Sequence, residues 1–96
     1  MGAEGEITFA DFAGRVGKTF DVPVRGHRLQ VILDAAQELP GSSRTGGGFR
    51  LEFLGPADPV LAQGIFAFEV ARDRYEIFIV PISRDQRGTR YEAVFY

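Results

Sequence analysis

The stretch that decides the fold is Lys18-Thr19-Phe20-Asp21-Val22-Pro23-Val24-Arg25-Gly26-His27-Arg28-Leu29-Gln30-Val31-Ile32-Leu33-Asp34-Ala35. Its apolar residues recur with a period of two, which predicts strands that bury one face. The first strand buries Phe20, Val22 and Val24, and the second buries Leu29, Val31, Leu33 and Ala35. Gly26 suits a positive φ at the tip of this hairpin, and Pro23 indicates that the first strand has an edge whose N–H groups are not needed.

Four further segments are predicted as strands: residues 49–54, 65–70, 74–82 and 90–96. Each is rich in β-branched or aromatic residues and is bounded by turn residues. Together with the hairpin they give six antiparallel strands over residues 18–96. The sequence therefore predicts a mainly β fold, either a small six-stranded antiparallel barrel or a two-layer sandwich, and closure into a barrel would remove exposed edges.

The same alternation predicts which side chains form the core. The expected core residues of the third to fifth strands are Phe49, Leu51, Phe53, Phe66, Phe68, Val70, Phe78, Val80 and Ile82. The other face of the fifth strand, with Tyr75, Ile77 and Ile79, is apolar as well, so we expect this strand to be central and covered on both sides. In the last strand Tyr91, Ala93 and Phe95 should face one side, Glu92, Val94 and Tyr96 the other, and the strand should be paired.

Residues 8–15 are predicted as one short helix, preceded by a flexible segment at residues 1–6. Thr8 can cap this helix, and Asp11 complements its dipole. Phe9, Phe12 and Val16 recur at i, i+3 and i+7, so they should lie on the core. The glycines between residues 14 and 17 should end the helix.

Length and composition favour one domain spanning residues 1–96. The absence of cysteine excludes disulfides and thiolate chemistry. Eleven basic and thirteen acidic residues give a net charge of −2, so nucleic acid and anionic membranes are not expected partners. The N-terminus lacks a secretory pattern and the longest apolar run, residues 77–82, is too short to span a bilayer, so a cytoplasmic location is expected.

No combination of residues predicts a catalytic, cofactor-binding or metal site, and we expect neither a cofactor nor enzymatic activity. His27 has no second histidine or cysteine to complete a metal site. Ser42, Ser43 and Ser83 have no partner base. The glycine-rich residues 40–48 should form a mobile hairpin loop, because a phosphate cradle would carry a lysine and lead into a helix.

Charged side chains on strands and turns are the remaining candidates. Glu69, Glu76 and Glu92 could converge across a barrel mouth as acid and base, but each alternates with inward apolar residues and should point to solvent. Arginines gather at three predicted turns: Arg25 and Arg28, then Arg72 and Arg74, then Arg84, Arg87 and Arg90. If the turns share one end, they form a basic rim for carboxylates or phosphates; otherwise they are solvated turns balanced by salt bridges.

Several short motifs together resemble an uncharacterised family of small bacterial domains. They are Asp11-Phe12, Leu54-Gly55-Pro56 through Pro59 to Gln63-Gly64, Phe78-Ile79-Val80-Pro81-Ile82 and Tyr91-Glu92-Ala93-Val94-Phe95. The resemblance implies a protein encoded near phage-tail-like fibre or collar proteins, with a role in assembling or decorating such particles. This chain has Val70-Ala71-Arg72-Asp73 where the family tends to carry a His-Pro pair and a glycine.

We therefore expect a non-enzymatic interaction or structural module, possible partners being a tail-fibre-like protein or a second copy of the chain. The alternative is a β-barrel that holds a small ligand, although nine phenylalanines are enough to fill a six-stranded interior.

Overall fold

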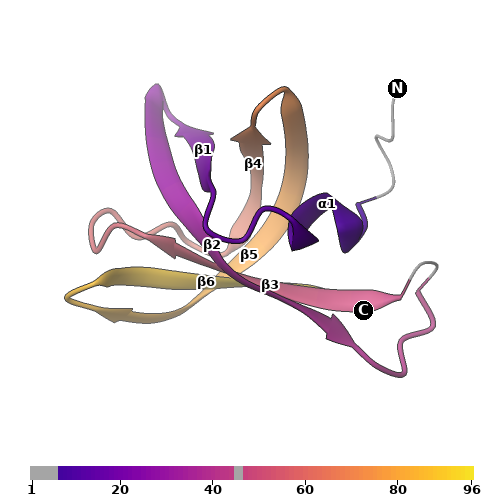
Figure 1. Cartoon of the computed structure of the whole chain (residues 1–96). Coiled ribbons are helices and arrows are strands. Elements are labelled where there is room, and N and C mark those ends of the chain that lie inside the picture. Colours follow the sequence, from indigo (N-terminus) through magenta and orange to yellow (C-terminus); the bar gives the residue numbers. More distant parts are fainter. Residues whose placement is uncertain (1–6, 45–46) are drawn as a thin grey trace.

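The computed structural model describes residues 7–44 and 47–96, in which six antiparallel strands form one sheet that closes into a barrel (Figure 1). The strand order around the barrel is β1-β2-β3-β6-β5-β4. The elements are α1 (Ala10–Ala13), β1 (Thr19–Val24), β2 (His27–Leu39), β3 (Gly48–Gly55), β4 (Gly64–Val70), β5 (Asp73–Asp85) and β6 (Gly88–Phe95). The predicted mainly β, antiparallel fold is confirmed, and of the two predicted architectures the structure has the barrel. The flexibility predicted for residues 1–6 lies outside the described residues.

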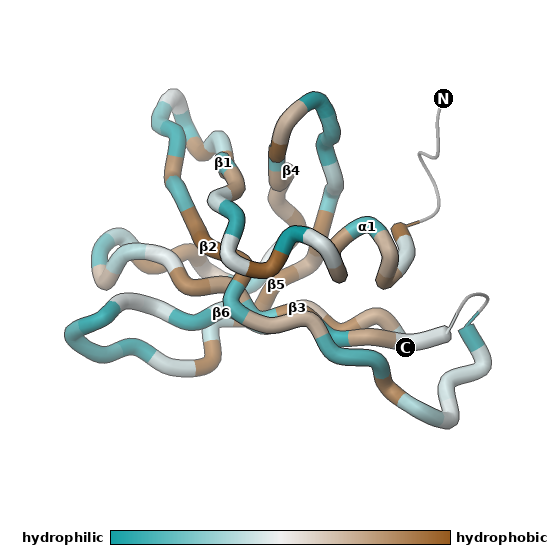
Figure 2. Tube along the Cα trace, in the orientation of Figure 1, coloured by the Kyte–Doolittle hydropathy of each residue, from teal (hydrophilic) through white to brown (hydrophobic). Residues whose placement is uncertain are grey.

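Tight turns close the β1–β2 and β4–β5 hairpins. In the β1–β2 turn Arg25 and Gly26 have φ of 50° and 82°, a pattern typical of a two-residue type I′ turn. The β4–β5 turn follows Val70 and places Ala71 at a φ of 53°. Figure 2 shows that the tip of the β4–β5 hairpin is hydrophilic.

Strand β2 is longer than the predicted strand, because it continues past Ala35 to Leu39. A register shift between Leu33 and Ala35 lets the strand bend and stay paired with β3. In the described part of the following loop, the Ser42 hydroxyl accepts a hydrogen bond from the Arg44 N–H, and Arg44 donates to the Ile7 carbonyl. The Arg44 guanidinium also lies 5.4 Å from the Phe49 ring centroid, so polar and cation–π contacts hold this part of the loop.

Helix α1 is a single turn, shorter than the predicted residues 8–15. The predicted Thr8 cap is wrong: the residue at the N-cap is Phe9, and Thr8 instead donates its N–H and hydroxyl to the Asp11 carboxylate. Phe12 is fully buried, but Val16 is half exposed, because the chain leaves the helix at Gly14 before residue 16 can turn toward the core. The predicted core position of Val16 is therefore wrong.

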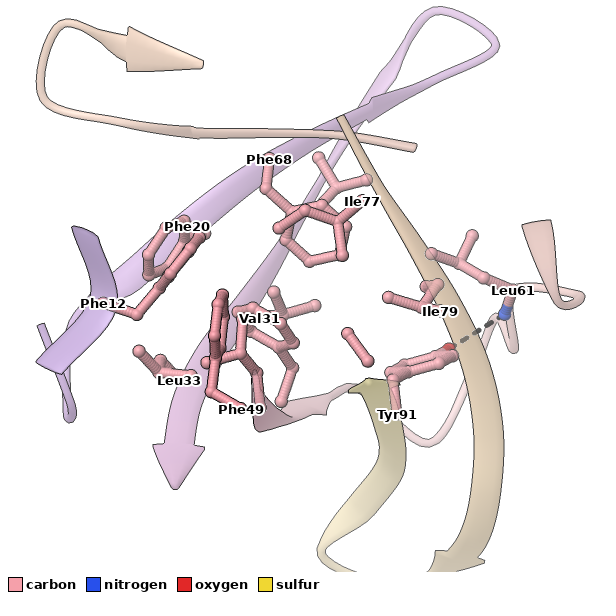
Figure 3. Packing of buried hydrophobic residues seen from close by; sticks show 14 residues of the cluster. Phe12, Phe20, Val31, Leu33, Phe49, Leu61, Phe68, Ile77, Ile79 and Tyr91 are labelled. Carbon is pink, nitrogen blue, oxygen red and sulfur yellow. Dashed lines mark hydrogen bonds between the residues drawn. The ribbon is translucent and has the colours of Figure 1, made fainter. Parts of the chain in front are cut away.

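Aromatic and aliphatic side chains fill the barrel (Figure 3). The buried hydrophobic residues are Phe12, Phe20, Val22, Val31, Leu33, Phe49, Leu51, Phe53, Leu61, Phe68, Ile77, Ile79, Tyr91 and Ala93. Phe12 from α1 packs on Phe20 and Tyr75, with ring centroids 6.1 and 5.0 Å away. The helix thus covers the opening of the barrel with one large side chain.

The inner face of β5 is opposite to the predicted one. Phe78 and Ile82 are exposed, whereas Ile77 and Ile79 are completely buried. Cross-strand partners share a face of the sheet, and Ile77 is the partner of Phe66. The outer face of β5 is therefore not covered, and the prediction that both faces are covered is wrong. The predicted core positions in β3 are confirmed, as is Phe68, with Phe66 and Val70 packed at the margin of the core.

The last strand is built into the barrel as predicted. It pairs with β3 and β5, with Tyr91 and Ala93 buried and Phe95 stacked on Phe49 at 4.5 Å. Tyr91 also fixes the crossing between β3 and β4, because its hydroxyl accepts a 2.8 Å hydrogen bond from the Leu61 N–H (Figure 3).

Candidate interaction surface

Four apolar side chains lie side by side on the outer face of β4, β5 and β6, and we call them the outer apolar cluster: Ile65, Phe78, Val80 and Val94. Ile65 and Phe78 are cross-strand partners and are 67% and 51% exposed. Val80 is the cross-strand partner of Glu92, so the same register places Val94 beside Phe78. Val94 is 54% exposed. The cluster is continuous across three neighbouring strands.

Charged residues border this cluster. Arg50 is the cross-strand partner of Val94 and donates to Glu52 and Glu92 at 2.9 and 2.8 Å, and these hydrogen bonds raise the pKa of Arg50. On β5 the next outward residue is Glu76, which lies 3.6 Å from Arg74. An apolar centre with a charged border is the composition of many protein–protein contact surfaces.

The three glutamates considered as acid and base do not converge. Glu69 pairs with Arg28 at 2.9 Å, Glu76 with Arg74, and Glu92 with Arg50. Each glutamate lies on the outer face and is bound by a different arginine. This confirms that they point away from the barrel interior.

The arginine-bearing turns are only partly brought together. Arg28 of the first turn and Arg87 of the third line one open depression of about 530 Å³, with Ile32 and Leu54 among its apolar lining residues. The Arg72 and Arg74 turn instead lies beside the segment that follows α1, where Arg15 bonds to Asp73 at 2.6 Å.

Salt bridges occupy most of these turn arginines. Arg28, Arg84 and Arg90 each lie within 3.0 Å of a carboxylate oxygen. Such exposed ion pairs contribute little to stability individually. Of the two interpretations of the arginine-bearing turns, the structure favours solvated turns balanced by salt bridges over one basic rim shared by all three turns.

His27, the remaining candidate from the sequence, is not part of a metal site in the described residues. His27 is exposed at the start of β2, where it faces Val24 across the hairpin. Within residues 7–44 and 47–96, no group of three or more histidines, cysteines or acids could hold a metal ion. Sequence reasoning missed Ile65 and Val94 as members of a surface, because their exposure depends on the register of β4 and β6 with β5.

The part of the chain that the structure describes contains no helix of the length and apolarity needed to cross a membrane. No curated protein and no solved structure is significantly similar to the chain. A family model described as "Domain of unknown function (DUF6916)" matches residues 7–95, which span the helix and all six strands. The chain therefore belongs to the DUF6916 family.

Proposed function

We propose that this chain is a non-enzymatic interaction module that binds another protein, as an accessory or assembly protein of a phage-tail-like particle. The observation that supports protein binding is the outer apolar cluster. In a closed barrel the hydrophobic core lies inside. Phe78 lies on the outer face of β5, so folding does not require this residue to be large and apolar.

The cluster is large enough to contribute useful affinity. Fully burying an aliphatic or aromatic side chain contributes about 1.5–3 kcal/mol. Ile65, Phe78 and Val94 still expose half or more of their surface, so covering all three contributes roughly 3 kcal/mol. This corresponds to about a hundredfold in affinity.

The particle assignment comes from the resemblance to small bacterial proteins encoded near phage-tail-like fibre or collar proteins. It implies a fibre-like or collar-like partner and a role in the bacterial cytoplasm, where such particles assemble. The alternative function, a barrel that holds a small ligand, gains no support from the interior, where Phe53 packs on Phe20 and Phe68 with centroids 5.6 and 4.6 Å away.

Pull-down with a phage-tail-like fibre protein, the kind of partner that the resemblance implies, tests the proposal. We expect association at micromolar concentration and a loss of at least about tenfold in affinity for Phe78→Ser, because such contact residues carry much of the binding energy. The matched control is Ile32→Ser, which removes a similarly exposed apolar side chain of β2 outside the cluster. No association, together with normal particles from a deletion strain, contradicts the proposal.

A further inference from the structure

The barrel is closed by very little hydrogen bonding between β1 and β4. In the described part of the chain this ladder consists of the single pair Asp21–Glu69, whereas β4 and β5 share seven pairs. The closing pair sets two carboxylates opposite each other, and Arg28 contacts both, at 3.8 and 2.9 Å. Figure 1 shows the β1–β2 and β4–β5 hairpins as neighbours, with β1 and β4 facing each other.

Proline explains why the ladder stops there. Extending the Asp21–Glu69 register by two residues sets Pro23 opposite Ala67. The β1–β2 turn closes on the pair Val24–His27, so the alternation of an antiparallel ladder directs the main-chain groups of residue 23 toward β4. Pro23 has no N–H to donate to Ala67, so the regular ladder does not continue past the Asp21–Glu69 pair.

Among the described residues, strand β4 consequently has main-chain N–H and C=O groups that are not paired with another strand of the barrel. Its turn closes on the pair Val70–Asp73, so the N–H and C=O groups of Ile65, Ala67 and Glu69 point away from β5. Only Glu69 has a partner in the β1–β4 ladder. In the described part of the chain Ile65 and Ala67 have no cross-strand partner on this side, so they present an edge of two donors and two acceptors, the arrangement to which an added strand binds.

The side chains along this edge are apolar and incompletely covered. In the extended register Val24 would face Phe66, and both are only partly buried although they pack against the core. We call the boundary between β1 and β4 the seam. A strand added at the seam would cover these two side chains while it forms hydrogen bonds to the main chain of Ile65 and Ala67.

We propose that the seam side of β4 is a strand-addition site that takes an extended, proline-free segment of a partner protein, with apolar side chains at alternate positions. The site rests on the proposed protein-binding function and adds a second contact to the outer apolar cluster, to which Ile65 belongs. Affinity comes from the main-chain hydrogen bonds of residues 65 and 67, and selectivity comes from the side chains that cover Val24 and Phe66.

Amide hydrogen exchange on the full chain, read residue by residue by NMR, tests the edge without any partner. The N–H groups of Phe66 and Phe68 point to β5 and should exchange slowly, whereas those of Ile65 and Ala67 should exchange at least about tenfold faster. Equal protection of all four amides overturns the inference, because the edge would then already be paired.

The second step uses a capped seven-residue peptide that alternates valine and threonine. At millimolar concentration it should slow exchange at Ile65 and Ala67 at least about threefold and leave Phe78 and Val94 unchanged, because the new strand bonds only to the seam side. The same peptide with N-methylated amides should have no effect. Absence of protection, or equal protection by the N-methylated peptide, overturns the inference.

A protein variant separates this site from the proposed function. Ala67→Pro removes an N–H that points away from β5, so it should keep the fold and abolish the peptide effect. Phe78→Ser should keep the peptide effect while it weakens capture of the fibre-like protein. A peptide effect that survives in folded Ala67→Pro overturns the inference, and the N-methylated peptide decides the question if that variant does not fold.

Discussion

Removing a single hydroxyl should weaken the fold, because Tyr91 holds the crossing between β3 and β4 through one buried hydrogen bond. The Tyr91 ring is completely buried, and its hydroxyl accepts from the Leu61 N–H at 2.8 Å, with Leu61 only 7% exposed. The substitution Tyr91→Phe keeps the ring and leaves that N–H without a partner. An unpaired buried donor costs about 1–3 kcal/mol.

Urea and thermal unfolding measure this cost. For a domain of this size 1 kcal/mol lowers Tm by about 4–8 °C, so we expect a decrease of at least about 4 °C with an unchanged urea m-value. The control is Tyr96→Phe, because Tyr96 is 66% exposed and its hydroxyl should contribute little. Equal Tm values for the two variants would show that the Tyr91 hydroxyl does not stabilise the fold, as would unchanged amide exchange at Leu61 in Tyr91→Phe.

Three further predictions concern stability. Phe12→Ala should cost about 3–5 kcal/mol, because the ring is completely buried between α1 and the barrel, whereas Val16→Ala should change the urea midpoint little. Ala71→Gly should raise the free energy of unfolding by roughly 0.5–1 kcal/mol, because Ala71 has a φ of 53°, and a lower value from urea unfolding would count against this account. Deleting residues 94–96 should lower Tm by at least about 8 °C, because Phe95 is lost from the aromatic core, and an unchanged Tm would mean that these residues form a free tail.

Much of the fold follows from local patterns in the sequence. Alternation in residues 18–35 identifies the first hairpin, and Gly26 marks its tip with a positive φ as predicted. Pro23 indicates an edge, and the structure places it where the ladder between β1 and β4 ends. These features depend on a few neighbouring residues, so they can be read without knowing the rest of the chain.

The orientation of β5 could not be predicted in this way. Both of its faces are apolar, so a period of two leaves the choice between Ile77 and Phe78 open. The pairing of Ile77 with Phe66 decides it, and that pairing depends on the length of the β4–β5 turn. The same register brings Ile65, Phe78 and Val94 together on the outside, which is why the outer apolar cluster was not foreseen.

Six antiparallel strands, one short helix and a buried final strand can be predicted from the sequence, because each of these depends on contacts between near neighbours or on simple alternation. The three-dimensional fold was needed to show that the sheet closes as a barrel, that Phe12 covers its opening, and that the ladder between β1 and β4 holds a single pair among the described residues. These features depend on registers between strands distant in the sequence, and a shift of one residue would exchange the buried and exposed faces of a strand.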